Sequence, residues 1–193
     1  MKLSDLTYCQ EHTLPRLHSM YRIQRTRRTT STVAIGPVRL PPTGLLSGRF
    51  DLPRTPVAYF AEEPETAAYE TLARREALAL SMADLQSRSM LWVQLTESVT
   101  LLDLRPHTPT WPVLTSLRFA CTQELASDAE RHGFAGLVYR SAQQYDHDCY
   151  TLFGPSISLL RRVESTPLVD RATGGLHHLL RDVARGAQME FVP

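Results

Sequence analysis

The 193-residue sequence predicts an α+β domain with a mixed, mostly antiparallel sheet and flanking helices. Short apolar runs of strand length recur from the first quarter of the chain to the last, and two segments between them carry apolar residues at helical spacing. Strands and helices do not alternate in the regular βαβ order that a parallel sheet requires. A chain of this length buries about 70% of its unfolded surface, so we expect one domain over residues 1–193.

The N-terminal quarter predicts a lead-in, one strand and a long loop. The first twenty residues have the character of a short helical or irregular segment, and the alternation from Tyr21 to Arg25 predicts a strand. Residues 36–48 contain three prolines and three glycines. This density forbids a long helix or a central strand, so we expect a loop that leads into Arg49.

A strand and a helix follow this loop. Residues 57–61 predict a short strand, and Pro64 suits the first turn of a helix. The predicted helix runs from about Pro64 to Met82, with Glu70 off its apolar stripe. The stripe consists of Tyr69, Leu72, Ala73, Ala77 and Leu80.

The second half predicts five strands and two helices. Residues 90–95 and 99–104 are expected to pair in hairpin fashion through the polar link 96–98. Apolar residues at steps of four from Leu117 to Ala129 predict a helix that ends near Gly133 in a left-handed cap. The remaining expected elements are strands over 136–141, 150–153 and 157–160 and a closing helix over 176–185.

Composition excludes several classes of function. The 21 basic side chains are balanced by 20 acidic ones, which gives no general attraction to nucleic acid, and the basic run at residues 25–28 lacks interleaved aromatic residues. Three widely separated cysteines suit a reducing compartment. The polar N-terminus and the absence of a long apolar run indicate no signal peptide and no membrane span. We therefore expect a cytoplasmic protein.

Residues 48–75 bring an arginine, a tyrosine and a helical glutamate to one neighbourhood, and Ser141 follows a later apolar strand. Each has a plain structural alternative. Arg49 suits a surface position, Tyr59 a core position and Ser141 a strand end, and Glu70 could pair with an arginine four positions later. A guanidinium beside a turn also suits bidentate binding of a phosphate, and Tyr59 could stack on a flat ring.

Other motifs give weaker signals. Residues 146–149 and the pair His177 and His178 have metal-capable side chains, but adjacent residues on a strand or turn point in different directions. We predict no metal site. No P-loop and no dinucleotide-binding glycine motif is present, and Ser141 lies outside any G-x-S-x-G motif.

The motifs GRFDLPRTPVAYF, ETAAYETLARR, GLVYRSA and YTLF occur in an order that resembles the RES domain family, which is named for an arginine, a glutamate and a serine. Those residues would be Arg49, Glu70 and Ser141. The resemblance is strongest over residues 21–153 and includes the Tyr21-Arg22 pair. Many relatives follow the arginine with an aromatic residue, an asparagine and a proline-glycine turn, whereas here Asp51 places a negative charge near the expected phosphate site.

The resemblance implies a fold related to ADP-ribosyltransferases and the toxin half of a RES and Xre-type toxin-antitoxin module. It implies an NAD phosphorylase or NAD glycohydrolase, which cleaves the nicotinamide glycosidic bond with phosphate or water as acceptor. Arg49, Glu70 and Ser141 would be catalytic. Substrate would be bound by Tyr21, Arg22, Arg49, Tyr59 and Ser141. A mono-ADP-ribosyltransferase acting on a protein and a non-enzymatic partner-binding module remain as alternatives.

The same resemblance implies no cofactor, since NAD is the substrate and inorganic phosphate a second substrate in the phosphorolytic case. The expected partners are NAD and an Xre-like antitoxin protein. Homodimer formation stays open. We expect neither a membrane nor nucleic acid as a direct partner.

Overall fold

The computed structural model describes residues 1–74 and 77–193 and confirms the α+β class. Its main sheet, as far as the described residues go, has eight strands in the order β1-β8-β9-β10-β5-β2-β7-β11. Only β8 and β9 pair in parallel within the described part of this sheet. The strands are β1 (Gln10–Leu14), β2 (Ser19–Arg25), β5 (Val57–Ala61), β7 (Arg88–Leu95), β8 (Val99–Asp103), β9 (Gly136–Arg140), β10 (Asp148–Phe153) and β11 (Leu160–Pro167).

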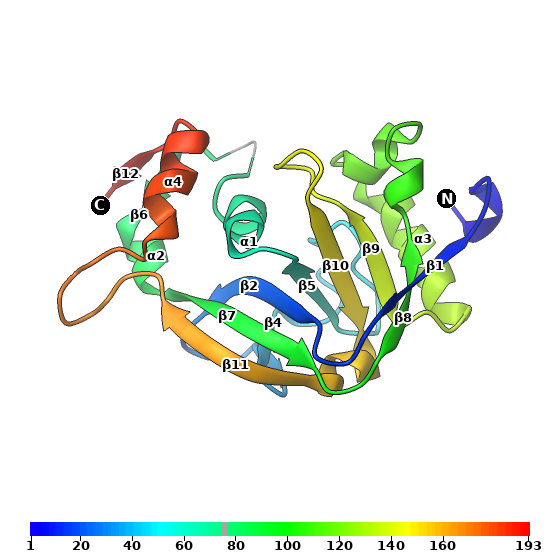
Figure 1. The fold of residues 1–193 in the computed structure, drawn as a ribbon, viewed down its shortest axis with the longest axis horizontal. Helices are drawn as coiled ribbons and strands as arrows, with labels where there is room; N and C mark the ends of the chain where they lie inside the picture. Colours follow the sequence, from blue (N-terminus) through cyan, green and yellow to red (C-terminus); the bar gives the residue numbers. More distant parts are fainter. Residues whose placement is uncertain (75–76) are drawn as a thin grey trace.

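A long antiparallel ribbon gives the sheet its curl. Strand β1 pairs with β8 and strand β2 pairs with β7, and the register is the same on both sides of the bend. Leu14 lies opposite Val99 and Ser19 lies opposite Gln94, so the two sides of the ribbon contain the same number of residues between these pairs. Leu17 takes a positive φ of 69° at the bend. The two halves of one ribbon therefore belong to different parts of the sheet (Figure 1).

The curl brings β5 back beside β2, where the sheet has a weak seam. These two strands share one register pair, Tyr21 with Ala61, whereas β2 and β7 share seven. Beyond that pair the two strands diverge. A parted sheet exposes backbone groups that a full ladder would satisfy, and the cleft described below opens at this seam.

Helices cover one face of the sheet, and α1 lies inside the curl (Figure 1). Short strands and a 3-10 turn cover the other face. The helices are α1 (Pro64–Thr71), α2 (Met82–Gln86), α3 (Phe119–Arg131) and α4 (Leu179–Gly186). The two small sheets pair β3 (Val33–Ile35) with β4 (Val38–Leu40) and β6 (Ala79–Ser81) with β12 (Glu190–Val192). The 3-10 segments are η1 (Leu3–Asp5), η2 (Arg105–His107), η3 (Pro112–Thr115) and η4 (Gly154–Leu159).

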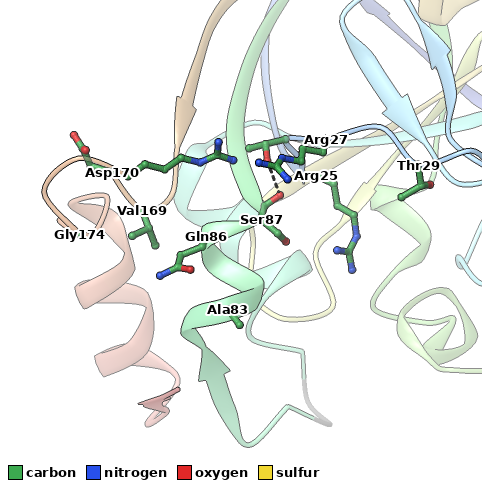
Figure 2. A pocket seen from close by; sticks show the side chains of 11 residues that line it. Arg25, Arg27, Thr29, Ala83, Gln86, Ser87, Val169, Asp170 and Gly174 are labelled. Atoms are coloured by element: carbon green, nitrogen blue, oxygen red, sulfur yellow. Dashed lines mark hydrogen bonds between the residues drawn. The ribbon is translucent and has the colours of Figure 1, made fainter.

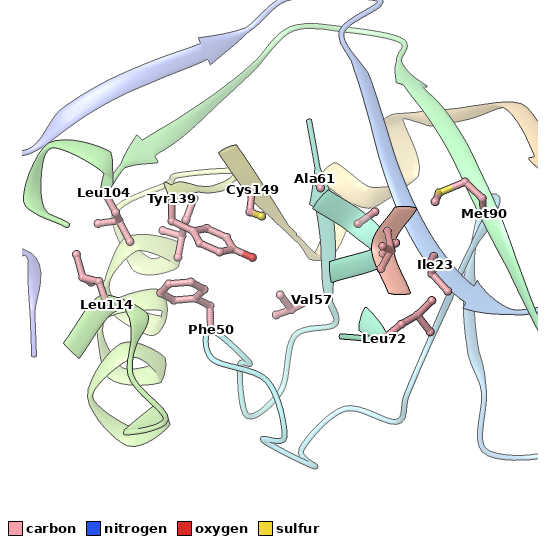
Figure 3. Packing of buried hydrophobic residues seen from close by; sticks show 14 of the residues in the cluster. Ile23, Phe50, Val57, Ala61, Leu72, Met90, Leu104, Leu114, Tyr139 and Cys149 are labelled. Carbon is pink, nitrogen blue, oxygen red and sulfur yellow. The ribbon is translucent and has the colours of Figure 1, made fainter. Parts of the chain in front are cut away.

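Alternation along the strands divides the apolar side chains between two cores. One core packs the sheet against α1, α3 and α4, and it contains Phe50, Tyr139 and Cys149 (Figure 3). The other core packs Phe60 and Tyr150 against β4 and η4. No helix in the described ranges is long and apolar enough to cross a bilayer.

The predicted helix over 64–82 is wrong beyond its second turn. Helix α1 ends at Thr71, and residues 75 and 76 lie outside the described residues. Leu80 is buried, but in strand β6, where it lies opposite Phe191 of the C-terminal strand. The parallel pairing with a segment remote in sequence replaces the helical turn that local spacing predicted.

The predicted hairpin over 90–104 is also wrong. Strands β7 and β8 do not pair, because residues 96–98 form the bend of the long ribbon. Thr96 donates hydrogen bonds from its amide and its hydroxyl to the Leu159 carbonyl, both at 2.8 Å, and so ties the bend to η4.

Three smaller differences concern boundaries. The N-terminal lead-in contains strand β1, and the proline-rich loop contains β4. The segment 157–160 is mostly 3-10 turn, with the following strand starting at Leu160. The strand over 57–61, the strand from Tyr21 and the second helix are confirmed, and Gly133 has the left-handed φ of 87° expected of its cap.

Candidate functional site

A cleft of about 330 Å³ opens at the seam between β2 and β5. Its walls come from these strands, from α1, from the loop before β5 and from the ends of β9 and β10. Five of the six predicted site residues line it, namely Tyr21, Arg22, Arg49, Tyr59 and Glu70. The sixth, Ser141, contacts Glu70. The structure therefore brings together residues separated by more than a hundred positions.

Glu70 is held by the turn that follows β9. One carboxylate oxygen, Oε1, accepts hydrogen bonds from the Ser141 hydroxyl at 2.5 Å, the Ala142 amide at 2.9 Å and the Gln143 amide at 3.3 Å. The expected pair with Arg74 does not involve this carboxylate, since the Arg74 Nε donates to the Glu70 backbone carbonyl. The side chain is thus oriented at the cleft wall by three donors.

Ser141 is buried and its hydroxyl is engaged with the protein. Besides donating to Glu70, the oxygen accepts the amides of Gln143 at 3.1 Å and Gln144 at 3.0 Å. These bonds fix the turn that also presents the Ala142 and Gln143 amides to the carboxylate. The structure places Ser141 as a support for Glu70, and a direct contact with substrate stays a prediction.

Arg49 lies against aromatic rings. Its guanidinium carbon is 5.9 Å from the Phe50 ring centre and 5.8 Å from that of Tyr139, and Thr122 donates a hydrogen bond to its backbone carbonyl at 2.5 Å. Within residues 1–74 and 77–193, Arg49 forms no ion pair and its buried Nε has no hydrogen-bond partner. Ring faces attract the cation without neutralising its charge.

Arg22 bridges the seam of the sheet. Its guanidinium donates to the carbonyls of Tyr59 and Arg39, both at 3.3 Å, and lies 5.7 Å from the Phe60 ring centre. Burial lowers the pKa of Arg22 to about 10. Across the described part of the chain it too lacks an ion pair, and its Nε has no hydrogen-bond partner. Two arginines without carboxylate partners among the described residues therefore line one cleft.

The two predicted tyrosines have different surroundings. The Tyr59 hydroxyl donates to Asp51 at 2.9 Å and accepts the Phe50 amide at 2.8 Å, so its polar end is bound within the protein. Burial, together with the negative charge of Asp51, raises the pKa of Tyr59 well above its ordinary value. The Tyr21 ring stacks on Trp92 with ring centres 5.9 Å apart. Both rings line the cleft, and stacking on a nicotinamide or adenine ring stays a prediction.

Residues that sequence reasoning missed at this site include Phe50, Tyr139, Thr122 and Cys149. Tyr139 lies in β9 two positions before Ser141, which follows that strand directly, and this period-two spacing is a signal that could have placed both on one face. Phe50 packs on Tyr139 with ring centres 4.7 Å apart (Figure 3). Burial raises the pKa of the Cys149 thiol well above its ordinary value, so this cysteine lines the cleft as a neutral group.

Apart from Cys149, the described residues of the weaker motifs do not line this cleft. His147 lies 3.3 Å from Glu63, whereas Asp148 pairs with Arg105 and Arg140. Among the residues described, no group of three or more histidines, cysteines or acids could hold a metal ion. The basic run contributes Arg25 and Arg27 to a separate hollow of about 590 Å³, which Figure 2 shows between α2 and the loop before α4. None of the predicted site residues lines that hollow.

The RES domain family matches residues 19–171. Among solved structures, a chain of the M. tuberculosis MbcT-MbcA toxin-antitoxin complex has the same fold, with a TM-score of 0.58 and 14% sequence identity over 81% of this chain and 86% of that chain. No curated protein matches. Since the family match covers most of the sequence and includes Arg49, Glu70 and Ser141, the chain belongs to the RES domain family.

Proposed function

We propose that this protein is an NAD-degrading toxin of a toxin-antitoxin module, which cleaves the glycosidic bond between nicotinamide and ribose. Membership of the RES domain family supports this proposal, as does a fold shared with a chain of a toxin-antitoxin complex. Water or inorganic phosphate is the acceptor, so the enzyme is an NAD glycohydrolase or an NAD phosphorylase.

One observation carries the proposal: Arg22 and Arg49 line the same cleft as the oriented carboxylate of Glu70, and neither arginine has a carboxylate partner among the described residues. Guanidinium groups without a carboxylate partner in a partly buried site favour binding of an anion, and their fork geometry matches phosphate oxygens. The pyrophosphate of NAD supplies such a group, with a cationic pyridinium ring at one end of the same molecule. The cleft's charges therefore match both parts of the substrate.

The reaction needs one well-placed carboxylate. When the bond between the ribose C1 atom and the pyridinium nitrogen breaks, the electron pair stays on nitrogen and nicotinamide leaves as a neutral molecule. No acid has to protonate it. The ribose becomes an oxocarbenium ion, whose positive charge the Glu70 carboxylate stabilises. A water oxygen or a phosphate oxygen then forms the new bond to C1, and with water one proton is released.

The surrounding residues orient this carboxylate and the substrate. Ser141 and two backbone amides bind one oxygen, Oε1, which directs the remaining acceptor capacity of Glu70 to the cleft. Tyr21 and Tyr59 offer ring surfaces in the cleft wall. Arg22 and Arg49 hold the pyrophosphate or recruit inorganic phosphate.

The test is direct. Purified protein is incubated with NAD, with and without inorganic phosphate, and products are identified by mass spectrometry. Hydrolysis gives nicotinamide and ADP-ribose, and phosphorolysis gives nicotinamide and phosphorylated ADP-ribose. ADP-ribose attached to added proteins would instead support the alternative of a mono-ADP-ribosyltransferase. Folded protein, freed of any inhibitor, that releases no nicotinamide would refute all three reactions and leave the non-enzymatic binding module.

An antitoxin protein of the Xre type is the proposed partner, because an unrestrained NAD consumer would poison its host. The complex that contains the structural neighbour supports such a pairing. Overexpression of the active protein alone should arrest growth, and co-expression with the adjacent reading frame should restore it. Harmless overexpression of active protein would contradict this partner.

A further inference from the structure

Asp51 stands in the wall of the cleft that contains Arg22 and Arg49. A carboxylate at such a place would be expected to repel an anion and so weaken its binding. Its hydrogen bonds point to a different role.

The carboxylate of Asp51 closes a small network around Arg49. Its Oδ2 accepts the Gly48 amide at 2.7 Å, and its Oδ1 accepts the Tyr59 hydroxyl at 2.9 Å. The Tyr59 oxygen in turn accepts the Phe50 amide at 2.8 Å. Gly48 and Phe50 are the residues on either side of Arg49, so both neighbouring amides are bound into one network.

Packing leaves this network little room to rearrange. A Cβ atom on Gly48 would lie 2.6 Å from the Asp51 Oδ1 and 2.6 Å from the Tyr59 hydroxyl oxygen, closer than real contacts. Phe50 is fully buried, and its ring packs on Tyr139. The strand β5, which carries Tyr59, is held on its other side by five register pairs with β10. The network thus anchors the Arg49 loop to the sheet.

The negative charge of Asp51 interacts with hydrogen-bond donors of this network. Two donors bind its two oxygens, and among the described residues the carboxylate forms no ion pair with Arg49 or Arg22. The Arg49 guanidinium lies against the Phe50 and Tyr139 rings instead. Its charge therefore remains available to a ligand.

We propose that Asp51 is a positioning residue, which acts with the Tyr59 hydroxyl to fix the backbone on both sides of Arg49 and so aims the guanidinium at an anion in the cleft. The inference rests on the proposed function in taking that anion to be the pyrophosphate of NAD. It assigns Asp51 a favourable effect on anion binding, opposite in sign to the repulsion that its charge alone would give.

Positioning by Asp51 would strengthen anion binding and repulsion by its charge would weaken it, so substitutions can distinguish the two effects. Asp51→Asn removes the charge and replaces one accepting oxygen by a donating amide, which cannot accept both present hydrogen bonds. Tyr59→Phe keeps the charge of Asp51 and removes the hydroxyl. Asp170→Asn is the matched control, because Asp170 accepts the amides of Ala172 and Thr173 in an exposed turn and does not line this cleft.

Binding of ADP, as a pyrophosphate probe, is measured by calorimetry for the purified full-length variants, together with KM and kcat for NAD. If Asp51 and the Tyr59 hydroxyl position Arg49, Asp51→Asn and Tyr59→Phe should each raise the Kd for ADP about tenfold, which corresponds to about 1.4 kcal/mol. The KM for NAD should rise in parallel, and Asp170→Asn should match the wild type. Partial unfolding would lower the binding stoichiometry instead of raising the Kd.

If the Asp51 carboxylate only repelled the anion, Asp51→Asn would lower the Kd for ADP. A lower Kd for Asp51→Asn with an unchanged Kd for Tyr59→Phe would overturn the positioning role. Unchanged values for both variants would overturn it as well. Wild-type protein that binds ADP but does not cleave NAD would refute the proposed reaction only, and the Kd comparison would still decide the role of Asp51. Wild-type protein that does not bind ADP would overturn both.

Discussion

Replacing Glu70 by glutamine removes one negative charge from the cleft and changes little else. Glutamine has the same length and a similar helix propensity, so α1 should be retained. Its amide oxygen can still accept hydrogen bonds from the Ser141 hydroxyl and the Ala142 and Gln143 amides. The variant therefore isolates the charge that would face the oxocarbenium ion in the proposed reaction.

The expected loss of turnover is at least about a hundredfold, the scale seen when one preorganised electrostatic group is deleted, or about 2.7 kcal/mol. The effect on stability is smaller. Three hydrogen bonds to a carboxylate become bonds to a neutral carbonyl, each weaker by about 1 kcal/mol, and the lower cost of desolvating a neutral side chain offsets part of this loss. We expect the free energy of unfolding to fall by no more than about 1–2 kcal/mol, which lowers Tm by about 3–6 °C for a chain of this size.

The assay compares nicotinamide release and thermal unfolding for wild type, Glu70→Gln and Glu65→Gln. Glu65 lies on the same helix and does not line the cleft, so its variant makes the same chemical change away from the site. Near-normal turnover by Glu70→Gln would refute the assignment of the catalytic carboxylate. Equal losses in both variants would indicate an effect on folding instead.

Three further outcomes are expected. Arg49→Lys should raise the Kd for ADP about tenfold, because an ammonium group cannot make the bidentate contact of a guanidinium, and an unchanged Kd in calorimetry would contradict this. Gly136→Ala should lower the free energy of unfolding by about 3 kcal/mol in denaturant titration, because its Cβ would lie 1.8 Å from the Thr151 carbonyl oxygen, and an unchanged midpoint would argue against this close approach. A chelator should leave NAD turnover unchanged, since none of the described residues gather into a metal-ligand cluster, and a loss that zinc or magnesium restores would show otherwise.

Local signals in the sequence were enough for single elements. Alternation predicted β5, Pro64 marked the start of α1, and Gly133 marked the end of α3, each within a residue or two of its place. In all three cases the signal is a property of neighbouring residues, namely side-chain period or a backbone preference.

Pairing between distant segments is where local reasoning failed. The bend at residues 96–98 has the composition of a hairpin turn, yet it continues the ribbon that residues 10–25 form with 88–103. Leu80 has the spacing of a helix and is buried in a strand beside Phe191. In both cases the partner strand is far away in sequence, and the free energy of pairing with it exceeds the local preference.

The sequence by itself determined the fold class and, through ordered motifs, the family, and it nominated Arg49, Glu70 and Ser141 as site residues. Tertiary structure alone decided how these residues act on one another. Ser141 supports Glu70, and Asp51 accepts hydrogen bonds from the Gly48 amide and the Tyr59 hydroxyl, whose oxygen accepts the Phe50 amide on the other side of Arg49. Curling of the sheet until β5 meets β2 at one pair creates the cleft. Hydrogen-bond partners and burial depend on distances between segments far apart in the chain, and no local pattern specifies those distances.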